Sequence, residues 1–429
     1  MSAVLDHPTS LLTTAPSSPA GFPAWFSARQ DSAWQRFLAT PQPKRGDEQW
    51  RFSSLKELDF STFMPSAETP DAARLLARSC SLEVSAAKFV FINDELVLSD
   101  SRLPDGVVCL PLAEALATHG ELVREHFMRR DTRLGSAKFT ALHEASLRNG
   151  LFVFVPDGVE VEEPIEVFHW LAGENVVIFP HTLIVTGRGA KVSVIDYFQS
   201  GNPADPGLAI AVNDLIAGPG SKLDYVAIQA FNEASKVIQV NETSVAADAS
   251  ATGFILNLGA SWARNESRSR LEGRGGRSDM LAVSVPTGTQ EFDQRTFQHH
   301  VAPGASSDLL YKNTLYDKSR TIFSGLISVD EGAHQTDAYQ TCRNLFMSDD
   351  AEANSMPGLE INADQVKCSH GSTSSQISDE EIFYLRARGI DPVRARQLIA
   401  RGFSIDVIDR LSNPALQDAA LRFLDAKFP

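Results

Sequence analysis

The sequence predicts a mainly β protein whose centre is a β-solenoid, with one helical region before it and a smaller one after it. From about Leu151 onward, short β-type runs alternate with Gly, Asn and Asp. One pattern occurs twice, at 182–196 and again at 213–227, and its second glycines, Gly189 and Gly220, are 31 residues apart. A period of this length indicates stacked supersecondary units.

Small residues continue this spacing along the chain. After Gly220 they recur at intervals of 27 to 31 residues, at Ala249, Gly276, Gly304, Gly332 and Ala363. Strand-rich repeats with small corner residues favour a solenoid in which each coil buries its inward side chains on the next. We therefore assign residues 151–372 to a β-helix core.

The region before the solenoid is expected to be helical. Residues 1–20 are rich in Ser, Thr, Pro and Ala and predict a disordered leader. Residues 21–150 predict a mostly helical domain, because helix formers there carry apolar residues at three- and four-residue spacing. Short strands are expected near 88–97. Trp50, in the run Glu48–Ser53, is interpreted as an aromatic anchor between this domain and its neighbour.

The pattern returns to helix in residues 373–429, which predict a small C-terminal helical domain. Ser378 and Glu381 match the capping box Ser-x-x-Glu, and an apolar run follows them. A compact bundle in this place serves as a cap for the solenoid or as a docking surface, and the sequence leaves both roles open.

A second helix is predicted inside this C-terminal region. Asp391 followed by Pro392 is typical of an N-cap with proline at the first helical position. Gly402 is expected to end the helix, and a third short helix is expected from about Ser404.

The composition argues against several classes of protein. A net charge of -15 and a pI near 5.1 disfavour a nucleic-acid binder, which needs a basic face. The four cysteines are scattered without a CxxC pair, which indicates reduced thiols rather than a disulfide framework. The leader lacks the order of a signal peptide and no long apolar run exists, so we expect a cytoplasmic protein without membrane insertion.

Motifs for enzymatic chemistry are absent from the sequence. Gly218–Lys222 has a superficial likeness to a phosphate loop, but the same form appears at Gly187–Lys191 and so marks a repeat corner. Carbohydrate-active enzymes are built on β-helices as well, yet those work outside the cell. The acidic pair Asp349–Asp350 lies in a polar segment typical of a solvated loop. A carbohydrate-active enzyme remains an alternative.

Cys368 and His370 are the main candidate for site chemistry. Two residues apart on a strand, they project from the same face. A thiol and an imidazole are soft-metal ligands, but two ligands cannot complete a site that takes four. The others would come from elsewhere, for example from another chain. On these residues alone, a packed cysteine beside an edge histidine is the slightly favoured interpretation.

The remaining histidines and cysteines are weaker candidates. His299 and His300 are adjacent, so they point to opposite faces of a strand and do not readily share a metal. Cys342 is expected to be packed in the core. Cys80 and Cys109 have no histidine near them in the sequence.

Taken together, four parts of the chain resemble the SufB/SufD family of iron–sulfur cluster assembly scaffolds. They are a helical N-terminal part with Glu48–Ser53, a solenoid middle, the run Lys367–Thr373, and the run Phe383–Ile390. The resemblance covers nearly all of the chain beyond the leader. The Cys-Ser-His-Gly form is more similar to the SufD type than to the SufB type.

This resemblance implies a non-catalytic scaffold with a right-handed parallel β-helix. It implies a SufB-like partner bound through the β-helix and a SufC-like ABC-type ATPase bound through the C-terminal helices. Iron or a nascent iron–sulfur cluster would be held transiently at the SufB–SufD interface, with Cys368 and His370 on this side. The residues implied in ATPase docking are Phe383, Tyr384, Leu385, Arg388 and Gly389.

Some alternatives stay open at this point. The chain could be a plain interaction solenoid in which Cys368 and His370 only pack. A flavin is possible as a cofactor but cannot be read from the sequence. Unpaired solenoid edges also favour a homodimer when the chain is isolated.

Overall fold

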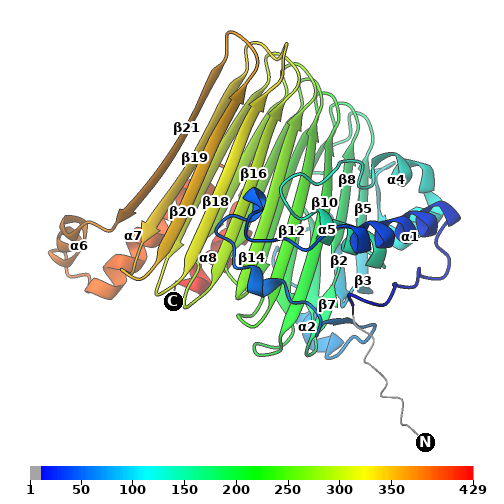
Figure 1. The fold of residues 1–429 in the computed structure, drawn as a ribbon, viewed down its shortest axis with the longest axis horizontal. Coiled ribbons are helices and arrows are strands. Elements are labelled where there is room, and N and C mark those ends of the chain that lie inside the picture. Colours follow the sequence, from blue (N-terminus) through cyan, green and yellow to red (C-terminus); the bar gives the residue numbers. More distant parts are fainter. Residues whose placement is uncertain (1–10, 429) are drawn as a thin grey trace, which may run out of the picture.

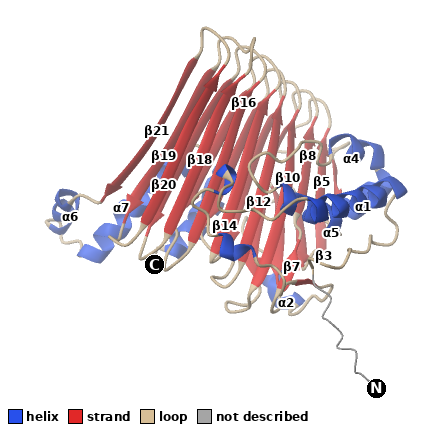
Figure 2. Cartoon of the chain, in the orientation of Figure 1, coloured by secondary structure: helices blue, strands red, loops and turns tan. Residues whose placement is uncertain are grey.

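The computed structural model describes residues 11–428, and its centre is a parallel β-solenoid (Figure 1). The strands form one continuous stack, with helices beside both ends of it (Figure 2). The predicted fold class, a mainly β solenoid between an N-terminal helical region and C-terminal helices, is confirmed. Among the described residues, no helix has both the length and the apolar character needed to cross a membrane.

Seventeen strands make up the solenoid. They are β5 (Leu151–Val155), β6 (Ile165–Leu171), β7 (Val176–Ile178), β8 (His181–Thr186), β9 (Lys191–Ser200), β10 (Gly207–Ala217), β11 (Lys222–Ala230), β12 (Lys236–Val245), β13 (Ser250–Asn257), β14 (Trp262–Leu271), β15 (Arg277–Ser284), β16 (Glu291–His300), β17 (Ser306–Leu315), β18 (Arg320–Val329), β19 (Asp337–Phe346), β20 (Glu352–Ile361) and β21 (Lys367–Gln376).

Each coil places one strand in each of two sheets, so hydrogen-bonded neighbours are two strands apart along the chain. In one sheet the order runs from β20 through β18, β16, β14, β12, β10 and β8 to β5, and in the other from β21 through β19, β17, β15, β13, β11 and β9 to β6. Pairing is parallel and in register, as where Leu208 to Ala217 of β10 face Lys236 to Val245 of β12. Inward side chains therefore stack on inward side chains of the next coil.

The first corners fall at or next to the residues that the repeat predicts, but in the last two coils the left-handed residue before the strand is Gln335 or Gln365, three and two residues after the predicted Gly332 and Ala363. Gly189, Gly220, Gly304 and Gly332 have φ values between 66° and 85°, the left-handed region that favours glycine. Two further corners are shifted by one residue. Asp248 and Gly275 take the left-handed conformation, and the expected corner residues Ala249 and Gly276 follow them. Aspartate tolerates this region because its short polar side chain can bond to the backbone locally, which an alanine side chain cannot do.

The N-terminal region combines helices with strands, and it contains more strand than the expected short segment near 88–97. Its elements are α1 (Ala24–Ala39), η1 (Glu48–Trp50), η2 (Leu55–Leu58), β1 (Met64–Pro65), α2 (Ala72–Arg78), β2 (Ala87–Ile92), β3 (Glu95–Ser101), β4 (Val108–Pro111), α3 (Leu112–Thr118), α4 (Gly120–His126) and α5 (Ala137–Ser146). Strand β2 continues one sheet by pairing with β6, and β3 pairs antiparallel with β2. Strand β4 pairs antiparallel with β5 in the other sheet.

The predicted leader is only partly described. Residues 1–10 lie outside the described residues. Leu11, which comes next, is buried in a cluster with Trp34 and Phe37 of α1. That segment of the leader therefore packs on the first helix.

Trp50 anchors the N-terminal region on the solenoid, as predicted. Its ring lies against the guanidinium of Arg264 on β14, 3.7 Å from the guanidinium carbon to the ring centroid, and its indole N–H donates to the carbonyl of Gly135 at 3.1 Å. Gly135 has a φ of 126°, and a Cβ built there would lie 2.6 Å from Nη2 of Arg264. Only glycine fits between the tryptophan and the arginine.

Arg264 itself is fully buried among groups from both regions. It donates to Glu266 at 2.7 Å, to the carbonyls of Gln49 at 2.9 Å and Leu134 at 2.7 Å, and to the carboxylate of Asp293. Asp293, which is also buried, is shared with Arg295, whose Nε donates to it at 2.6 Å. We call Arg264, Glu266, Asp293 and Arg295 the buried ion cluster.

Three C-terminal helices follow β21: α6 (Asp379–Arg386), α7 (Pro392–Ile408) and α8 (Pro414–Lys427). The predicted capping box is confirmed, because the Ser378 and Glu381 side chains each bond the other's backbone. Asp391 caps α7 by accepting from two N–H groups, and Pro392 is its first residue, as predicted.

Two predictions about this region were wrong. Helix α7 continues through Gly402 to Ile408, so Ser404 lies inside it and the third helix begins at Pro414 instead. The reason is packing: Val407 and Ile408 are buried in a cluster with Leu281 of β15. Burial of that turn outweighs the roughly 1 kcal/mol that a mid-helix glycine costs.

Candidate functional site

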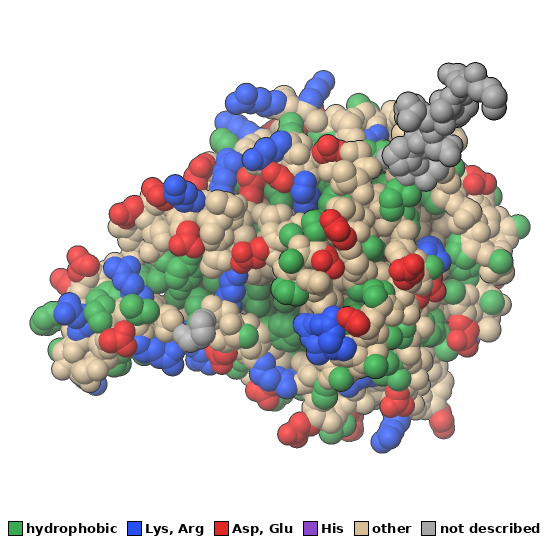
Figure 3. Space-filling view, turned by 90° about the horizontal axis from the view of Figure 1, so that it is seen from below, with side chains coloured by type: hydrophobic (Ala, Val, Ile, Leu, Met, Phe, Trp, Pro, Cys, Tyr) green, Lys and Arg blue, Asp and Glu red, His purple; other side chains and the backbone are tan. Residues whose placement is uncertain are grey.

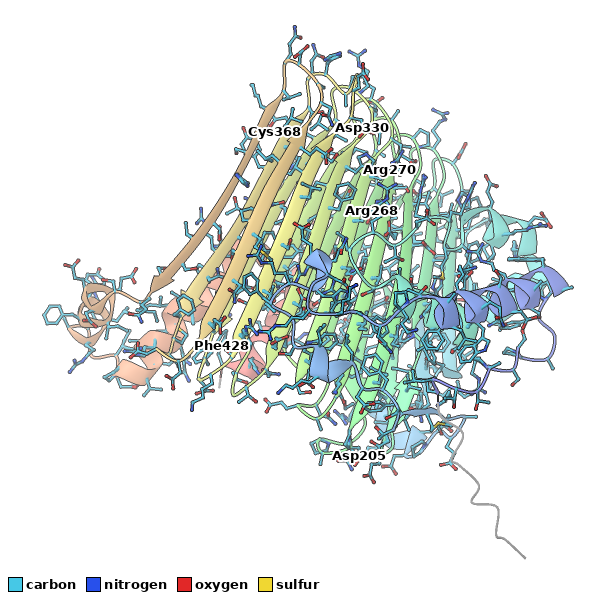
Figure 4. The ribbon with its side chains drawn as sticks, viewed as in Figure 1. Asp205, Arg268, Arg270, Asp330, Cys368 and Phe428 are labelled. Atoms are coloured by element: carbon cyan, nitrogen blue, oxygen red, sulfur yellow. The ribbon has the colours of Figure 1, made fainter. Side chains whose placement is uncertain are left out.

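Cys368 and His370 lie on β21, the outermost strand of the solenoid (Figures 1 and 4). In the register with β19, Cys368 faces Ala338 and His370 faces Gln340. Both Ala338 and Gln340 are buried and point into the solenoid. Paired residues of neighbouring parallel strands point to the same side of the sheet. The thiol and the imidazole therefore extend the row of inward-pointing side chains and share one face; the shared face was predicted.

That inward row is open, because β20 and β21 form the last coil of the described chain. Most residues of β21, including His370, are exposed, and Cys368 is partly buried. On β20 the inward Leu359 and Ile361 are exposed as well, although they stack on the buried Ile327 and Val329 of β18. We call this last turn, 352–376, the end coil.

The environment of Cys368 favours a protonated thiol. Partial burial raises the pKa of the thiol above its usual value, the nearby Asp337 carboxylate raises it further, and the backbone of Ala338 lowers it. A thiol in this state becomes a thiolate when a metal ion binds it, because the cation replaces the proton. Among the described residues, no group of three His, Cys, Asp or Glu side chains is arranged to hold a metal ion.

A second thiol lies one coil deeper. Cys342 on β19 is completely buried, as predicted, and burial raises its pKa to about 12. Asn313 is its nearest amide donor, with Nδ2 3.7 Å from the sulfur, and the Ser355 hydroxyl of β20 is 3.9 Å away. Both contacts are weak, so Cys342 behaves as a packed core residue.

The histidine pair of β16 splits between two faces, as predicted. His300 is buried inside the solenoid with Nε2 2.8 Å from the Ser307 hydroxyl. His299 faces outward, with Nε2 2.9 Å from Asp330 and Nδ1 2.9 Å from Arg270. Figure 4 labels Arg270 and Asp330 near the same end of their strands as Cys368. The two rings are therefore separated by the sheet and cannot hold one metal together.

Burial of His300 leads to a pH-dependent prediction. Desolvation lowers its folded-state pKa to about 4, whereas the unfolded value is near 6.5. Between those values the unfolded chain binds the extra proton, so His300 destabilises the fold as the pH falls from about 6.5 toward 4. We expect wild type to lose about 2 kcal/mol more stability than His300→Gln between pH 8 and pH 5.

Thermal unfolding at several pH values measures this difference. His334→Gln, which changes an exposed histidine, is the matched control and is expected to follow wild type. If the stabilities of wild type and His300→Gln depend equally on pH, burial does not lower the pKa of His300 in the folded protein.

Helix α6 presents an apolar surface at the same end of the molecule. Phe383 is 71% exposed and Tyr384 is 56% exposed, while Leu385 is partly buried. Figure 3 shows hydrophobic side chains among charged ones at the end of the molecule that carries α6. Arg388 stacks on Tyr384, with 4.4 Å from the guanidinium carbon to the ring centroid, and donates to its hydroxyl. Gly389 turns the chain with a φ of 86°.

Sequence reasoning missed several residues of these two surfaces. Val393, at the start of α7, is 66% exposed beside the α6 surface, and Tyr339 of β19 is exposed near the end coil. The inward residues Leu359 and Ile361 were missed too. The repeat contained the signal for them, since the inward positions of a last coil have nothing to stack on.

These features define a solenoid with one open end, an inward thiol–imidazole pair there, and a nearby apolar helix. The family model "SUF system FeS cluster assembly, SufBD core domain" matches residues 169–403, and "SufBD protein N-terminal region" matches residues 20–167. The chain belongs to the SufBD family.

Known members of this family are similar along most of their length. The iron–sulfur cluster assembly protein SufD of Escherichia coli K12 is 28% identical over 404 residues, which span 92% of this chain and 91% of that protein. SufD of Bacillus subtilis 168 is 26% identical over 335 residues, covering 77% and 76% of the two chains. A SufBD family protein of Synechocystis is 26% identical, covering 87% and 85%.

Proposed function

We propose that this chain is a scaffold subunit in iron–sulfur cluster assembly by the Suf system, most like SufD, and that it works in the cytoplasm without catalytic activity of its own. The family match and the similarity to proteins named SufD support the assembly role. The observation that carries the finer proposal is the open end coil, whose inward face holds Cys368 and His370.

The partner at the end coil is proposed to be a SufB-like paralogue. Strands β20 and β21 each keep one edge without a strand neighbour in the described chain, and such edges pair readily with another chain. The exposed inward residues of the end coil, among them Leu359 and Ile361, would be covered by that partner. The same partner would supply the ligands that Cys368 and His370 lack for a cluster or iron.

Helix α6 is proposed to dock a SufC-like ABC-type ATPase. An exposed Phe–Tyr pair with an arginine beside it is the composition of an interface anchor. Only Ser378 and its neighbour Ile377 separate α6 from the end of β21 at Gln376. Closure of the ATPase on ATP would therefore pull directly on the strand that carries the thiol and the imidazole.

The chemistry assigned to the pair follows from its residue types. The Cys368 sulfur is a soft ligand for iron or for a cluster once its proton is displaced. The exposed His370 imidazole can bind metal through a ring nitrogen or accept that proton. Iron and sulfide are cargo in this role, so binding is transient.

The test is to co-express this chain with SufB- and SufC-like partners and purify the complex through this chain. We expect Cys368→Ser with His370→Ala to keep the subunits associated and to lower bound iron and acid-labile sulfide at least fivefold. The matched control is Cys80→Ser with His119→Ala, which alters an exposed thiol and a partly exposed imidazole in the N-terminal region, away from the end coil.

The other outcomes separate the alternatives. Unchanged iron and sulfide in an intact complex would assign the pair to packing and leave an interaction solenoid. Failure to recover either partner would contradict the scaffold proposal as a whole. Turnover of a polysaccharide by the isolated chain would favour the carbohydrate-active alternative.

A further inference from the structure

A hollow between α1 and the segment that follows α4 is lined by five arginines. They are Arg29, Arg36, Arg124, Arg129 and Arg130, and the cavity has a volume of about 730 Å³. Helices α1 and α4 lie at the end of the solenoid opposite α6 (Figure 1). The hollow is thus remote from the end coil and from the residues proposed for cluster assembly.

The charge in this hollow is unusual for the chain. The protein has a net charge of -15, yet five guanidiniums converge here on two lining carboxylates, Asp131 and Glu144; a third carboxylate, Glu272, lies outside the lining and pairs with Arg130. Glu144 is buried and takes both Arg29 and Arg36 as partners. Arg124 and Arg129 have no carboxylate partner within the described residues. Like charges that converge without compensation repel, and a bound anion relieves that repulsion.

Several of the arginines are held in place before any ligand arrives. Arg29 donates to the carbonyl of Met128 at 2.8 Å and lies over the ring of Phe127, with 5.1 Å from the guanidinium carbon to the ring centroid. Arg124 lies over the ring of Trp25, with 5.7 Å from the guanidinium carbon to the ring centroid. Guanidiniums fixed in this way lose less side-chain entropy when they bind an oxyanion.

The rest of the lining fits an organic phosphate. The hydroxyls of Thr132 and Thr140 are 2.9 Å apart and add hydrogen-bonding groups, while Ala137 and Ala141 give an apolar side. The volume is in the range of small-molecule sites rather than of flat protein interfaces. Guanidinium forks match the geometry of phosphate oxygens better than any other side chain does.

We propose that this hollow binds a small phosphate-bearing ligand, with Arg124 and Arg129 as direct contacts. This activity goes beyond cluster assembly and does not depend on it. Neither arginine forms an ion pair among the described residues and both are exposed, so their replacement leaves the fold intact.

Titration calorimetry on the full-length chain tests the proposal with inorganic pyrophosphate, ADP and adenosine as probes. We expect wild type to bind pyrophosphate or ADP but not adenosine, and Arg124→Gln with Arg129→Gln to weaken that binding at least tenfold. Arg188→Gln with Arg274→Gln removes two exposed charges at solenoid corners and is expected to bind as wild type does.

Three results would overturn the proposal. If wild type binds neither phosphate probe at millimolar concentration, the hollow is not a phosphate-binding site. Equal weakening of phosphate binding in both double variants would show that binding depends on the net charge of the protein rather than on this hollow. Binding of polyglutamate without binding of a phosphate probe would assign the surface to an acidic polypeptide. ADP binding tighter than pyrophosphate binding would identify the ligand as a nucleotide; the reverse would identify a free diphosphate.

Discussion

Replacing Arg264 by methionine is expected to lower the free energy of unfolding by about 3–5 kcal/mol. The arginine is fully buried, and the change leaves the carboxylates of Glu266 and Asp293 in the same buried place without their shared cation. Removing one partner of a buried ion pair lowers the free energy of unfolding by far more than the intact pair adds to it, because the remaining charge stays buried without water or a counter-ion. Arg295 still contacts Asp293, whereas Glu266 has no other ion-pair partner among the described residues.

The loss has a second component at the junction between the N-terminal region and the solenoid. Arg264 also donates to the carbonyls of Gln49 and Leu134 and packs on Trp50. Its removal loosens the segments that these residues belong to. We therefore expect limited proteolysis to cut Arg264→Met between α1 and α5 under conditions in which wild type resists.

Chemical denaturation measures the change, with Arg277→Met as the control. Arg277 on β15 is exposed and forms two hydrogen bonds to Asp279, so its loss is expected to cost well under 1 kcal/mol. Adding Glu266→Gln to Arg264→Met is expected to restore part of the stability, since Glu266 has no other cation and the second change removes its stranded charge. A change within 1 kcal/mol of wild type would show that the buried ion cluster does not hold the junction.

The double change Phe383→Ala with Tyr384→Ala is expected to weaken ATPase binding by roughly 4 kcal/mol, about a thousandfold, if each ring is a central anchor worth about 2 kcal/mol. Both rings are mostly exposed, so the fold itself is expected to keep its unfolding temperature. The Arg388 guanidinium stacks on Tyr384 and would lose its support at the same time.

Surface plasmon resonance with the SufC-like partner measures this effect. Leu38→Ala with Val84→Ala removes two similarly exposed hydrophobic side chains far from α6 and is the matched control. A loss of affinity smaller than tenfold would exclude α6 as the docking helix. A loss in both double variants would indicate nonspecific hydrophobic association.

The repeat made the solenoid predictable because corners impose a backbone requirement that recurs every coil. Gly189, Gly220 and Gly304 are in the left-handed region for the same reason, two residues before β9, β11 and β17, so their spacing in the sequence predicted where the coils turn. Strand alternation predicted that Cys368 and His370 share one face, but not that this face points inward, which follows from their pairing with the buried Ala338 and Gln340. Gly402 failed as a helix end because burial of the next turn against β15 could not be read locally.

The buried ion cluster escaped sequence reasoning for a different physical reason. Arg264, Glu266, Asp293 and Arg295 occupy the outward positions of their strands, where charged residues normally meet water. They are covered by two segments distant in sequence, through contacts such as Ser136 with Glu266, 130 residues apart, and Ser53 with Asp293, 240 residues apart. Alternation predicts which face a side chain occupies, but not what lies on that face. The arginine-lined hollow formed between helices was hidden in the same way.

The two ends of the solenoid differ in a way that limits how many copies can join. At the N-terminal end the sheets finish in β3 and β4, which are antiparallel, short, and carry Glu95, Asp100 and Pro111. Such edges resist further strand addition. At the other end β20 and β21 keep parallel, full-length edges. A solenoid that can add strands at just one of its ends can join one other chain through that end. The resulting pair has no free edge left for further addition, so its assemblies are finite and do not polymerise into fibres.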